Sequence, residues 1–524
     1  MSTEQYQQEI RLLCHELERY DHFSVIGAAV TSLVADNSDR KTAIMRMPWV
    51  LLLLLKLALL GKSGEKCISR EEFYKFANRL YNIQHLASNL DPQTIELQLR
   101  PMFFQQLWYQ RGDEAALLSL FRQSLLLGGD NVWYADAFYR ASGVQLRNFY
   151  LITMHIMLSV QSHRLTVLEL NLFQLIHNLC PQISFKELFR YLALVGVRSS
   201  DLPAFIDSHR LDDIYPSEYY QDTPLKDRPI LINGEQLLVL DSVLFFAGMA
   251  EFVPRFLKKI PGHKDQFGPD FERYIDELMA FSRLQYWPEE VIGSFYRRHG
   301  IQGKVVDFLA YNDKQVVLIE SKAIEPNSIV KTATDPELLK RLLEKSFIKA
   351  IWQGVHSAAG LSKTSEFKGK KFSLLIVTHE DFGIFGGRWV ADYVDVGLEQ
   401  ELMQAYPEIA LSLDDIFYCT INDLEDLARG HAAGIVDFFD LIDSATTAGI
   451  SGAERRMIFQ QVILERLKGA ADRHESLMKE MDRYLEDMRC VAKRNNEFWS
   501  GKAMSLMATR EHLLRALNLK KGQF

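Results

Sequence analysis

The chain has 524 residues, of which 48% are hydrophobic and 24% are charged. This balance excludes an intrinsically disordered protein, and the length predicts two or three globular domains. The net charge of −8 argues against a tight, non-specific nucleic-acid binder, because neutralising phosphates drives such affinity, so any nucleic-acid contact has to come from local positive charge.

Residues 1–225 are predicted to form an all-helical domain. Ser69 and Glu72 have the spacing of a capping box, which opens a helix. The longest apolar run, 49–60, is interrupted by Lys56 and is too short to span a bilayer, so we interpret it as a buried helix and expect no membrane contact. Such a domain could recognise substrate, sense a protein that triggers activity, or repress a catalytic site, and the sequence does not choose among these roles.

The cysteines and the residues after Met1 indicate the cellular compartment in which the protein is expected. The five cysteines are scattered, without the paired spacing of a zinc site or a disulfide framework. Polar residues follow Met1, where a secretory signal would have a basic and apolar leader. We therefore expect the protein to be cytoplasmic.

A hairpin signal marks the start of a second domain. Asn233-Gly234 stands between two apolar runs within 228–240, in a chain that is otherwise helical up to that point. We place the boundary near residue 225 and assign 226–430 to the second domain.

A second hairpin is predicted further along this domain. The runs 305–311 and 316–319 are rich in β-branched and aromatic residues, and the polar residues 312–314 form the turn between them. Two antiparallel strands are the simplest fold of this segment.

Three charged residues converge on one patch of this hairpin. Glu320 and Lys322 project to the same face of their strand, and antiparallel pairing brings Asp307 within a residue or two of Glu320. Two neighbouring carboxylates repel each other in an apolar sheet unless a cation neutralises them, and ligation by oxygen alone favours Mg²⁺ or Mn²⁺ over zinc. We predict Asp307, Glu320 and the carbonyl of Ser321 as metal ligands.

This layout suits metal-dependent cleavage of a phosphodiester. A hard cation at the two carboxylates would polarise a phosphate oxygen and lower the pKa of a bound water. Lys322 would stabilise the attacking hydroxide or the extra negative charge of the transition state. The predicted reaction is in-line hydrolysis.

The segment 303–323, GKVVDFLAYNDKQVVLIESKA, resembles the core of the PD-(D/E)XK nuclease superfamily, the restriction-endonuclease-like fold. The resemblance covers roughly residues 228–430. It implies a short mixed sheet flanked by helices, with an acidic residue often on a helix before the hairpin and a second helix after Glu-x-Lys. The proline that often precedes the aspartate is Val306 here, a variation that removes no ligand.

The helix before the hairpin is predicted within 267–279, FGPDFERYIDELM, whose apolar residues recur at helical spacing. By the resemblance, Glu272 would be the helix carboxylate, although Asp276 or Glu277 could take its place. An exposed helix residue without a catalytic role is the alternative.

The helix after the hairpin is predicted to start at Asp335-Pro336, an N-cap followed by proline at the first helical position. It runs to Gln353, where many members of the superfamily carry a glutamine at the active site. Ser357 stands where one large branch has tyrosine, so the match is to the superfamily alone. Basic residues around this helix are the candidate nucleic-acid contacts, and a solvated helix face is the alternative: Lys331, Lys340, Arg341, Lys345 and Lys349.

Residues 431–524 are predicted to be helical and locally basic, with eight basic against two acidic residues between Arg489 and Phe524. The amphipathic pattern predicts packing on the amino-terminal helices or on a second copy, which would make a homodimer. For the basic charge itself, a solvated helix face is the alternative to nucleic-acid contact.

Together these features predict an α+β multidomain protein that acts as a cytoplasmic, Mg²⁺-dependent endonuclease. DNA is favoured over RNA as substrate because DNA cleavage is commonest in the superfamily, and cleavage of RNA, such as transfer RNA, is the alternative within the enzyme class. A catalytically silent nucleic-acid-binding or assembly protein that keeps the fold is the alternative outside it. Stand-alone nucleases with large helical additions resemble bacterial restriction and anti-phage defence effectors, which suggests that role by analogy.

Overall fold

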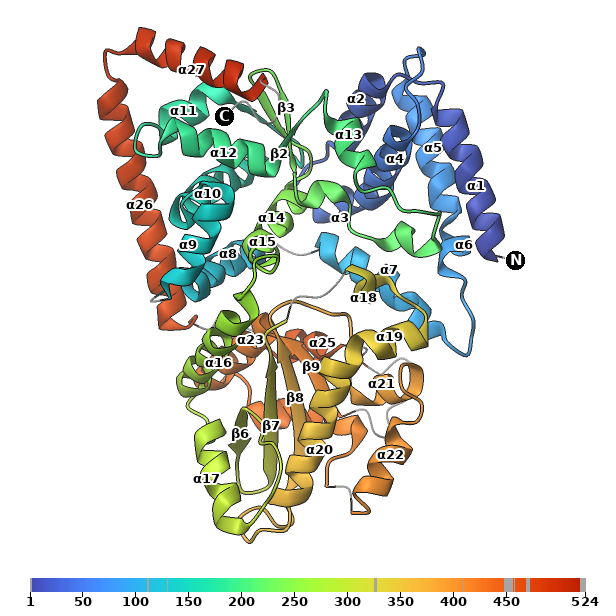
Figure 1. Cartoon of the computed structure of the whole chain (residues 1–524), viewed down its shortest axis with the longest axis vertical. Coiled ribbons are helices and arrows are strands. Elements are labelled where there is room, and N and C mark those ends of the chain that lie inside the picture. The colour runs from blue at the N-terminus through green and yellow to red at the C-terminus, as the bar shows by residue number, and fades with distance from the viewer. Residues whose placement is uncertain are drawn as a thin grey trace. The chain divides into compact units, whose positions relative to one another are not determined.

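The chain folds into two compact units (Figure 1). The computed structural model of this protein describes residues 2–110, 113–129, 131–324, 328–408, 410–446, 456, 458–467 and 472–518. The first unit comprises Met1–Ile260 and Lys479–Phe524, and the second comprises Pro261–Met478. The second unit is thus inserted into the sequence of the first. The expected α+β multidomain layout is confirmed, whereas the division falls at residue 260 instead of near residue 225.

The first unit is mainly helical. Its α-helices are α1 (Ser2–Leu17), α2 (His22–Leu33), α3 (Arg40–Met45), α4 (Pro48–Leu60), α5 (Arg70–Asn82), α6 (Gln84–Ser88), α7 (Ile95–Gln110), α8 (Asp113–Gly128), α9 (Val132–Ser142), α10 (Leu146–Ser162), α11 (Leu172–Leu179), α12 (Phe185–Val195), α13 (Leu202–Asp207), α14 (Ser242–Ala250), α15 (Phe252–Leu257), α26 (Glu475–Trp499) and α27 (Ala503–Asn518). Short 3₁₀ turns, η1 (Pro216–Tyr220) and η2 (Pro224–Lys226), precede the sheet hairpin.

The first unit also contains a small sheet, so the prediction that 1–225 is all-helical is wrong. Its strands are β1 (Leu168–Asn171), β2 (Gly196–Arg198), β3 (Ile230–Asn233) and β4 (Gln236–Val239), in the order β1-β4-β3-β2. The β3–β4 hairpin at Asn233-Gly234 is confirmed, and Gly234 has the positive φ that this turn requires. β1 and β2 have only four and three residues, and the strands they pair with lie far along the chain, so no local sequence pattern predicted them.

α4 is the central helix of this unit. Its residues from Pro48 to Leu59 are all buried, and the apolar ones from Trp49 to Leu59 belong to one large hydrophobic core. Among the described residues, one segment, Lys41–Leu60, has the length and hydropathy of a membrane span, but 67% of it is buried inside the structure. Apolar neighbours surround α4, as the interpretation of 49–60 as a buried helix requires.

The carboxy-terminal helices pack on the first unit. The Ser124 hydroxyl on α8 is hydrogen-bonded to the carboxylate of Glu480 (2.6 Å) and to the hydroxyl of Tyr484 (2.7 Å) on α26. The indole N–H of Trp499 donates to the carbonyl of Cys180, again at 2.6 Å. Of the two packing modes predicted for this segment, packing on the amino-terminal helices is the one observed, and 431–524 does not form a separate unit.

The second unit contains a mixed five-stranded sheet. Its strands are β5 (Tyr286–Pro288), β6 (Phe308–Tyr311), β7 (Gln315–Lys322), β8 (Lys371–Thr378) and β9 (Ile416–Thr420), in the order β5-β6-β7-β8-β9. β6 is antiparallel to both neighbours, while β7, β8 and β9 are parallel. The predicted β6–β7 hairpin is confirmed.

Helices cover this sheet. They are α16 (His263–Ser282), α17 (Glu289–His299), α18 (Ser328–Thr332), α19 (Pro336–Leu343), the π-helical turn η3 (Glu344–Ile348), α20 (Lys349–Leu361), α21 (Gly387–Tyr393), α22 (Leu398–Ala405), η4 (Leu413–Asp415), α23 (Ile421–Ala432), α24 (Phe438–Ser444) and α25 (Phe459–Arg466). α20 packs on β7 and β8 and lies in front of the sheet in Figure 1. α16 packs on α23 and β7.

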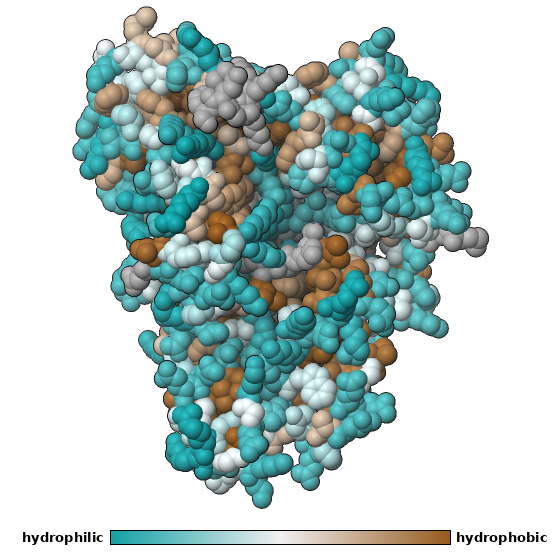
Figure 2. Space-filling view, viewed as in Figure 1, coloured by the Kyte–Doolittle hydropathy of each residue, from teal (hydrophilic) through white to brown (hydrophobic). Residues whose placement is uncertain are grey.

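The surface differs in character from these cores. On the face shown in Figure 2, hydrophilic residues cover most of the area and hydrophobic ones occur in smaller patches. Apolar side chains of the central strands, such as Leu318 and Leu374, are instead fully buried. A buried charge in such a sheet therefore needs a specific explanation.

Candidate active site

The β6–β7 hairpin places Asp307 opposite Glu320. Phe308 pairs with Ile319, so the next step of the same register aligns Asp307, just before β6, with Glu320 on β7. Residues opposite each other on antiparallel strands project to the same face. Glu320 and Lys322 lie two residues apart on one strand and share that face.

Hydrogen bonds hold this group together. The backbone N–H of Ser321 donates to Oδ2 of Asp307 at 2.6 Å. Lys322 Nζ forms an ion pair with Oε1 of Glu320. Glu320 is only 2% exposed, and its Oε2 is buried without a hydrogen-bond partner among the described residues. An orphaned carboxylate oxygen costs free energy, so this atom is available to a ligand that can pair with it.

A third carboxylate, Glu272 on α16, faces the same group. Burial raises the pKa of Glu272 to about 7, and the carboxylates of Asp307 and Glu289 add to the rise. Burial and then Asp307 raise the pKa of Glu320 to about 7 as well, against the opposing effect of Lys322. Several carboxylates therefore crowd one poorly solvated place, where each disfavours the ionisation of the others.

Neither of the two acids named as substitutes for Glu272 faces this group. Asp276 accepts a hydrogen bond from the hydroxyl of Tyr286 at 2.9 Å. Glu277 acts electrostatically on His474. Of the three candidate acids Glu272, Asp276 and Glu277, Glu272 is the one that contributes to the raised pKa of Glu320.

Glu289 is a site residue that the sequence did not suggest. Pro288 pairs with Phe308, so the next step of that register aligns Glu289 with Asp307. Continued by one step, the register thus aligns Glu289, exposed at the start of α17, with Asp307 just before β6 and with Glu320 on β7. β5 has three residues including a proline, which is too weak a strand signal to place Glu289 from the sequence.

Gln353 lies half-buried on α20, and no hydrogen bond joins it to the carboxylates among the described residues. Its neighbour Gly354 packs against β8, because a Cβ there would lie 2.5 Å from the side chain of Leu374. The predicted helix start is confirmed, since Asp335 caps α19 by accepting from the N–H of Leu338.

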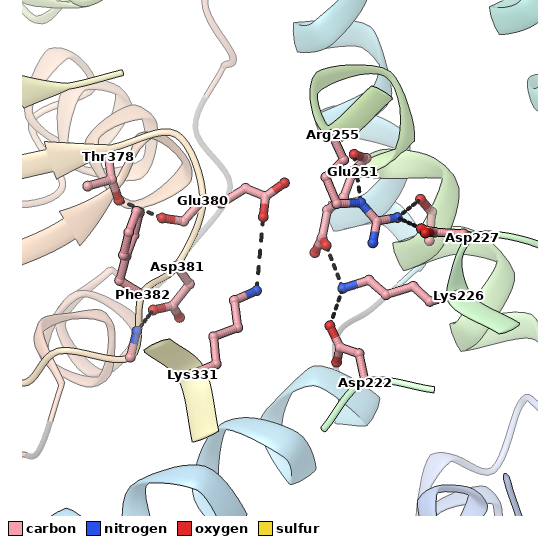
Figure 3. A network of polar contacts seen from close by, with 12 residues as sticks. Asp222, Lys226, Asp227, Glu251, Arg255, Lys331, Thr378, Glu380, Asp381 and Phe382 are labelled. Carbon is pink, nitrogen blue, oxygen red and sulfur yellow. Dashed lines mark hydrogen bonds and ion pairs between the residues drawn. The ribbon is translucent and has the colours of Figure 1, made fainter. Parts of the chain in front are cut away.

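The five predicted nucleic-acid contacts divide into two kinds. Lys331 lies 4.0 Å from Glu380 (Figure 3), and Lys340 lies 2.8 Å from Asp395. The other three are exposed and form no ion pair within the described part of the chain: Arg341, Lys345 and Lys349. These three recur every four residues through α19, η3 and α20, so they follow one side of the helix as an exposed basic stripe.

The donor set fits a hard cation in its chemistry. Carboxylate oxygens crowd together, one of them buried and unpaired, and oxygen is the donor that Mg²⁺ and Mn²⁺ prefer. In the described residues, however, no three His, Cys, Asp or Glu side chains are grouped closely enough to hold a metal ion. Both carboxylates already have partners within the chain. Lys322 forms an ion pair with Glu320, and the backbone N–H of Ser321 donates to Asp307.

Comparison with known proteins does not assign the chain to a family. No protein-family model matches the chain, and no curated protein and no solved structure is significantly similar to it. The function has to be argued from the residues themselves.

Proposed function

We propose that this protein is a metal-dependent endonuclease that hydrolyses phosphodiester bonds of nucleic acid, with DNA favoured over RNA. The observation that carries the proposal is the alignment of Asp307 with Glu320 at one register position, with Lys322 on the same face. This is the arrangement that the resemblance to PD-(D/E)XK nucleases requires.

The order of elements supports a restriction-endonuclease-like core. A helix with an inward carboxylate, α16 with Glu272, precedes the hairpin, and the α19–α20 helix follows Glu-x-Lys. The sheet between them is mixed. Each of these features belongs to the fold that the resemblance implies.

Each residue has a proposed role. Asp307, Glu320 and the carbonyl of Ser321 would hold Mg²⁺ or Mn²⁺, which when bound supplies a Lewis acid at the scissile phosphate. The Ser321 N–H orients Asp307. If the Glu320 carboxylate held a cation, the ammonium of Lys322 would be free of its present ion pair and would stabilise negative charge on the phosphate or on the attacking hydroxide. Glu272 would complete the acidic face, and Gln353 has no hydrogen bond among the described residues that assigns it a role.

The proposed setting follows from the same features. All five cysteines are free thiols, which supports a reducing, cytoplasmic location. The exposed stripe of Arg341, Lys345 and Lys349 offers local positive charge to a phosphate backbone in a chain of net charge −8. A role in bacterial anti-phage defence, with a protein trigger sensed by the helical unit and a homodimer to cut two strands, is proposed by analogy.

A catalytically silent nucleic-acid-binding protein is the second candidate. The ion pair between Lys322 and Glu320 favours it, because the pair occupies the groups that catalysis needs. If that pair is permanent, neither a cation nor a phosphate gains access to them.

One cleavage assay separates these candidates. Purified full-length protein is incubated with plasmid, linear DNA and total RNA, with Mg²⁺, with Mn²⁺ and with chelator. We expect metal-dependent cutting of DNA, its loss in Asp307→Asn, and full activity in the matched control Asp313→Asn, which lies in the turn at the other end of the same hairpin. Cutting of RNA alone would change the substrate. Binding without cutting under every condition would favour the silent protein.

A further inference from the structure

An aromatic residue continues the exposed basic stripe of the second unit. Trp352 follows Lys349 by three residues on α20, which is a neighbouring position on a helix. It is partly exposed, and among the described residues its indole N–H is neither hydrogen-bonded nor buried, so part of the ring reaches solvent. Ile351 and Val355, on the other side of the same helix, are buried. The outer surface of α19, η3 and α20 therefore presents three cations followed by an indole.

A second aromatic ring is fixed beside this indole. Tyr406, at the end of α22, has its ring centroid 6.5 Å from that of Trp352, at an interplanar angle of 55°. The two helices lie side by side in Figure 1. Nε2 of His356 on α20 donates to the carbonyl of Gln302 at 2.6 Å, so Nδ1 of the neutral imidazole accepts from the Tyr406 hydroxyl at 2.8 Å. Tyr406, which is also partly exposed, is thus held in place by the chain itself.

Basic residues outnumber acidic ones on the helical stretch that carries the indole. From Pro336 to Trp352 there are four basic residues and two acidic ones, Glu337 and Glu344. One of the four basic residues, Lys340, lies 2.8 Å from Asp395, and the other three are the exposed stripe. A row of cations with aromatic rings at its end is the complement of a phosphate backbone whose bases are accessible.

The stripe leads away from the proposed catalytic carboxylates. β7 ends at Lys322, whereas β8 begins at Lys371, which pairs with Gln315 at the opposite end of β7. The helices between these strands therefore return along the sheet, and α19 comes before α20 on that return. Arg341 and Trp352 are eleven residues apart, which is about 16 Å along a helix. A strand that lies across the carboxylates would thus reach the indole after it has followed the stripe.

We propose that Trp352 stacks on an unpaired base, so that the substrate of this protein is nucleic acid with single-stranded stretches. This inference rests on the proposed function and specifies its substrate class. The bases of a duplex are stacked on one another and shielded from the outer surface of a helix, whereas an unpaired base offers its face to an aromatic ring. Every base has such a face, so we expect no strong preference for sequence.

The test is fluorescence anisotropy of the full-length protein with labelled oligonucleotides, in chelator so that no metal-dependent cleavage occurs. The probes are single-stranded DNA, single-stranded RNA and a blunt DNA duplex of the same sequence and length. We expect at least one single strand to bind about tenfold more tightly than the duplex or better. Duplex binding that is equal or tighter overturns the proposal, and so does the absence of binding to every probe.

Cleavage of the same probes with Mg²⁺ separates this inference from the proposed function. Cutting of the blunt duplex by a protein that binds it more tightly than single strands would overturn the inference and leave the proposed function standing. Preference for single strands without cutting under any condition would support the inference and favour the catalytically silent protein.

Two variants of one residue locate the contact. Trp352→Leu keeps apolar bulk without a ring, and it should weaken single-strand binding by about 5- to 10-fold, the lower part of what stacking supplies, because the indole is only partly exposed. Trp352→Phe keeps a ring and should lose less than about threefold, and neither variant should change duplex binding. Trp133→Leu, at a partly exposed indole of the first unit, is the matched control and should bind as the natural chain does.

Equal losses in Trp352→Leu and Trp352→Phe, or no loss in either, would remove base stacking from the role of this residue and overturn the assignment. Thermal unfolding of each variant checks that it is folded. The preference of the natural chain for single strands tests the proposal even if a variant does not fold.

Discussion

Each unit of this protein buries a lysine–glutamate pair, and the two pairs differ in what surrounds them. In the first unit Lys56 and Glu218 lie 2.6 Å apart, and a second buried lysine, Lys226, has two carboxylates of its own. In the second unit the pair of Lys322 with Glu320 stands among further carboxylates, and the pKa of Glu320 is raised to about 7 by burial and by Asp307.

The difference teaches how buried charge indicates a ligand. In the first unit each buried ammonium is paired with a carboxylate, and no carboxylate oxygen of the Lys56–Glu218 pair is left buried without a partner among the described residues. Where carboxylates outnumber ammonium groups, the unpaired atom is a carboxylate oxygen and a cation is favoured. Net local charge, more than the presence of a salt bridge, separates the two sites.

The largest expected effect is on stability in the first unit. Lys56→Met leaves Glu218 buried without its partner, and we expect the free energy of unfolding to fall by about 3–5 kcal/mol. Urea denaturation followed by circular dichroism measures it. The double variant Lys56→Met with Glu218→Gln should recover most of the loss, because no unpaired charge remains. A loss below about 1 kcal/mol in the single variant would mean that the pair is solvated.

The next effect is on catalysis in the second unit. Lys322→Met removes the proposed stabiliser of phosphate charge, and we expect cleavage to fall by about 100- to 1000-fold while nucleic-acid binding is retained. Single-turnover cleavage and a filter-binding assay measure the two quantities. The matched control is Lys314→Met, an exposed lysine in the turn of the same hairpin. Cleavage at the natural rate in Lys322→Met would remove this residue from the mechanism.

The pH dependence of stability distinguishes the carboxylates around Glu320 from the ion pair of Lys56 with Glu218. Between the usual glutamate pKa of 4.5 and the raised value of about 7, the folded protein binds more protons than the unfolded chain, so its stability falls as pH rises through this window. We expect a lower Tm at about pH 8 than at about pH 5 without metal, and a rise on adding Mg²⁺ at the higher pH.

Two variants check the origin of that dependence. Glu320→Gln should flatten the fall in Tm and weaken the response to Mg²⁺, because one of the crowded carboxyls no longer ionises. Glu337→Gln, an exposed glutamate on α19, is the control and should keep both responses. A Tm that is unaffected by Mg²⁺ throughout would argue against a cation site at these carboxylates.

The smallest effect concerns substrate affinity. Replacing Arg341, Lys345 and Lys349 together by glutamine should weaken nucleic-acid binding and make its dependence on salt less steep, by up to about 2.7 in the slope of log K against log salt for three lost phosphate contacts. Fluorescence anisotropy over a salt series measures it. The control replaces Lys363 and Lys368, which are exposed near the carboxy-terminal end of α20. A slope equal to that of the natural chain would mean that the stripe is only a solvated helix face.

The sequence by itself determined the features that depend on neighbouring residues. Alternation and a polar turn predicted the β6–β7 hairpin, and the cap at Asp335 predicted the start of α19. The apolar run of α4 was recognised as buried from its composition. Local patterns suffice here because the chain within each segment sets the periodicity, the turn and the cap.

Only the tertiary structure decided what depends on segments far apart in the chain. It aligned Glu289 with Asp307, selected Glu272 among the acids of α16, and paired Lys56 of α4 with Glu218 of the turn η1. It also paired β1 and β2 with a hairpin far along the chain, and so moved the boundary of the first unit to Ile260. These outcomes follow from strand pairing and packing between distant residues, which no pattern within one segment records.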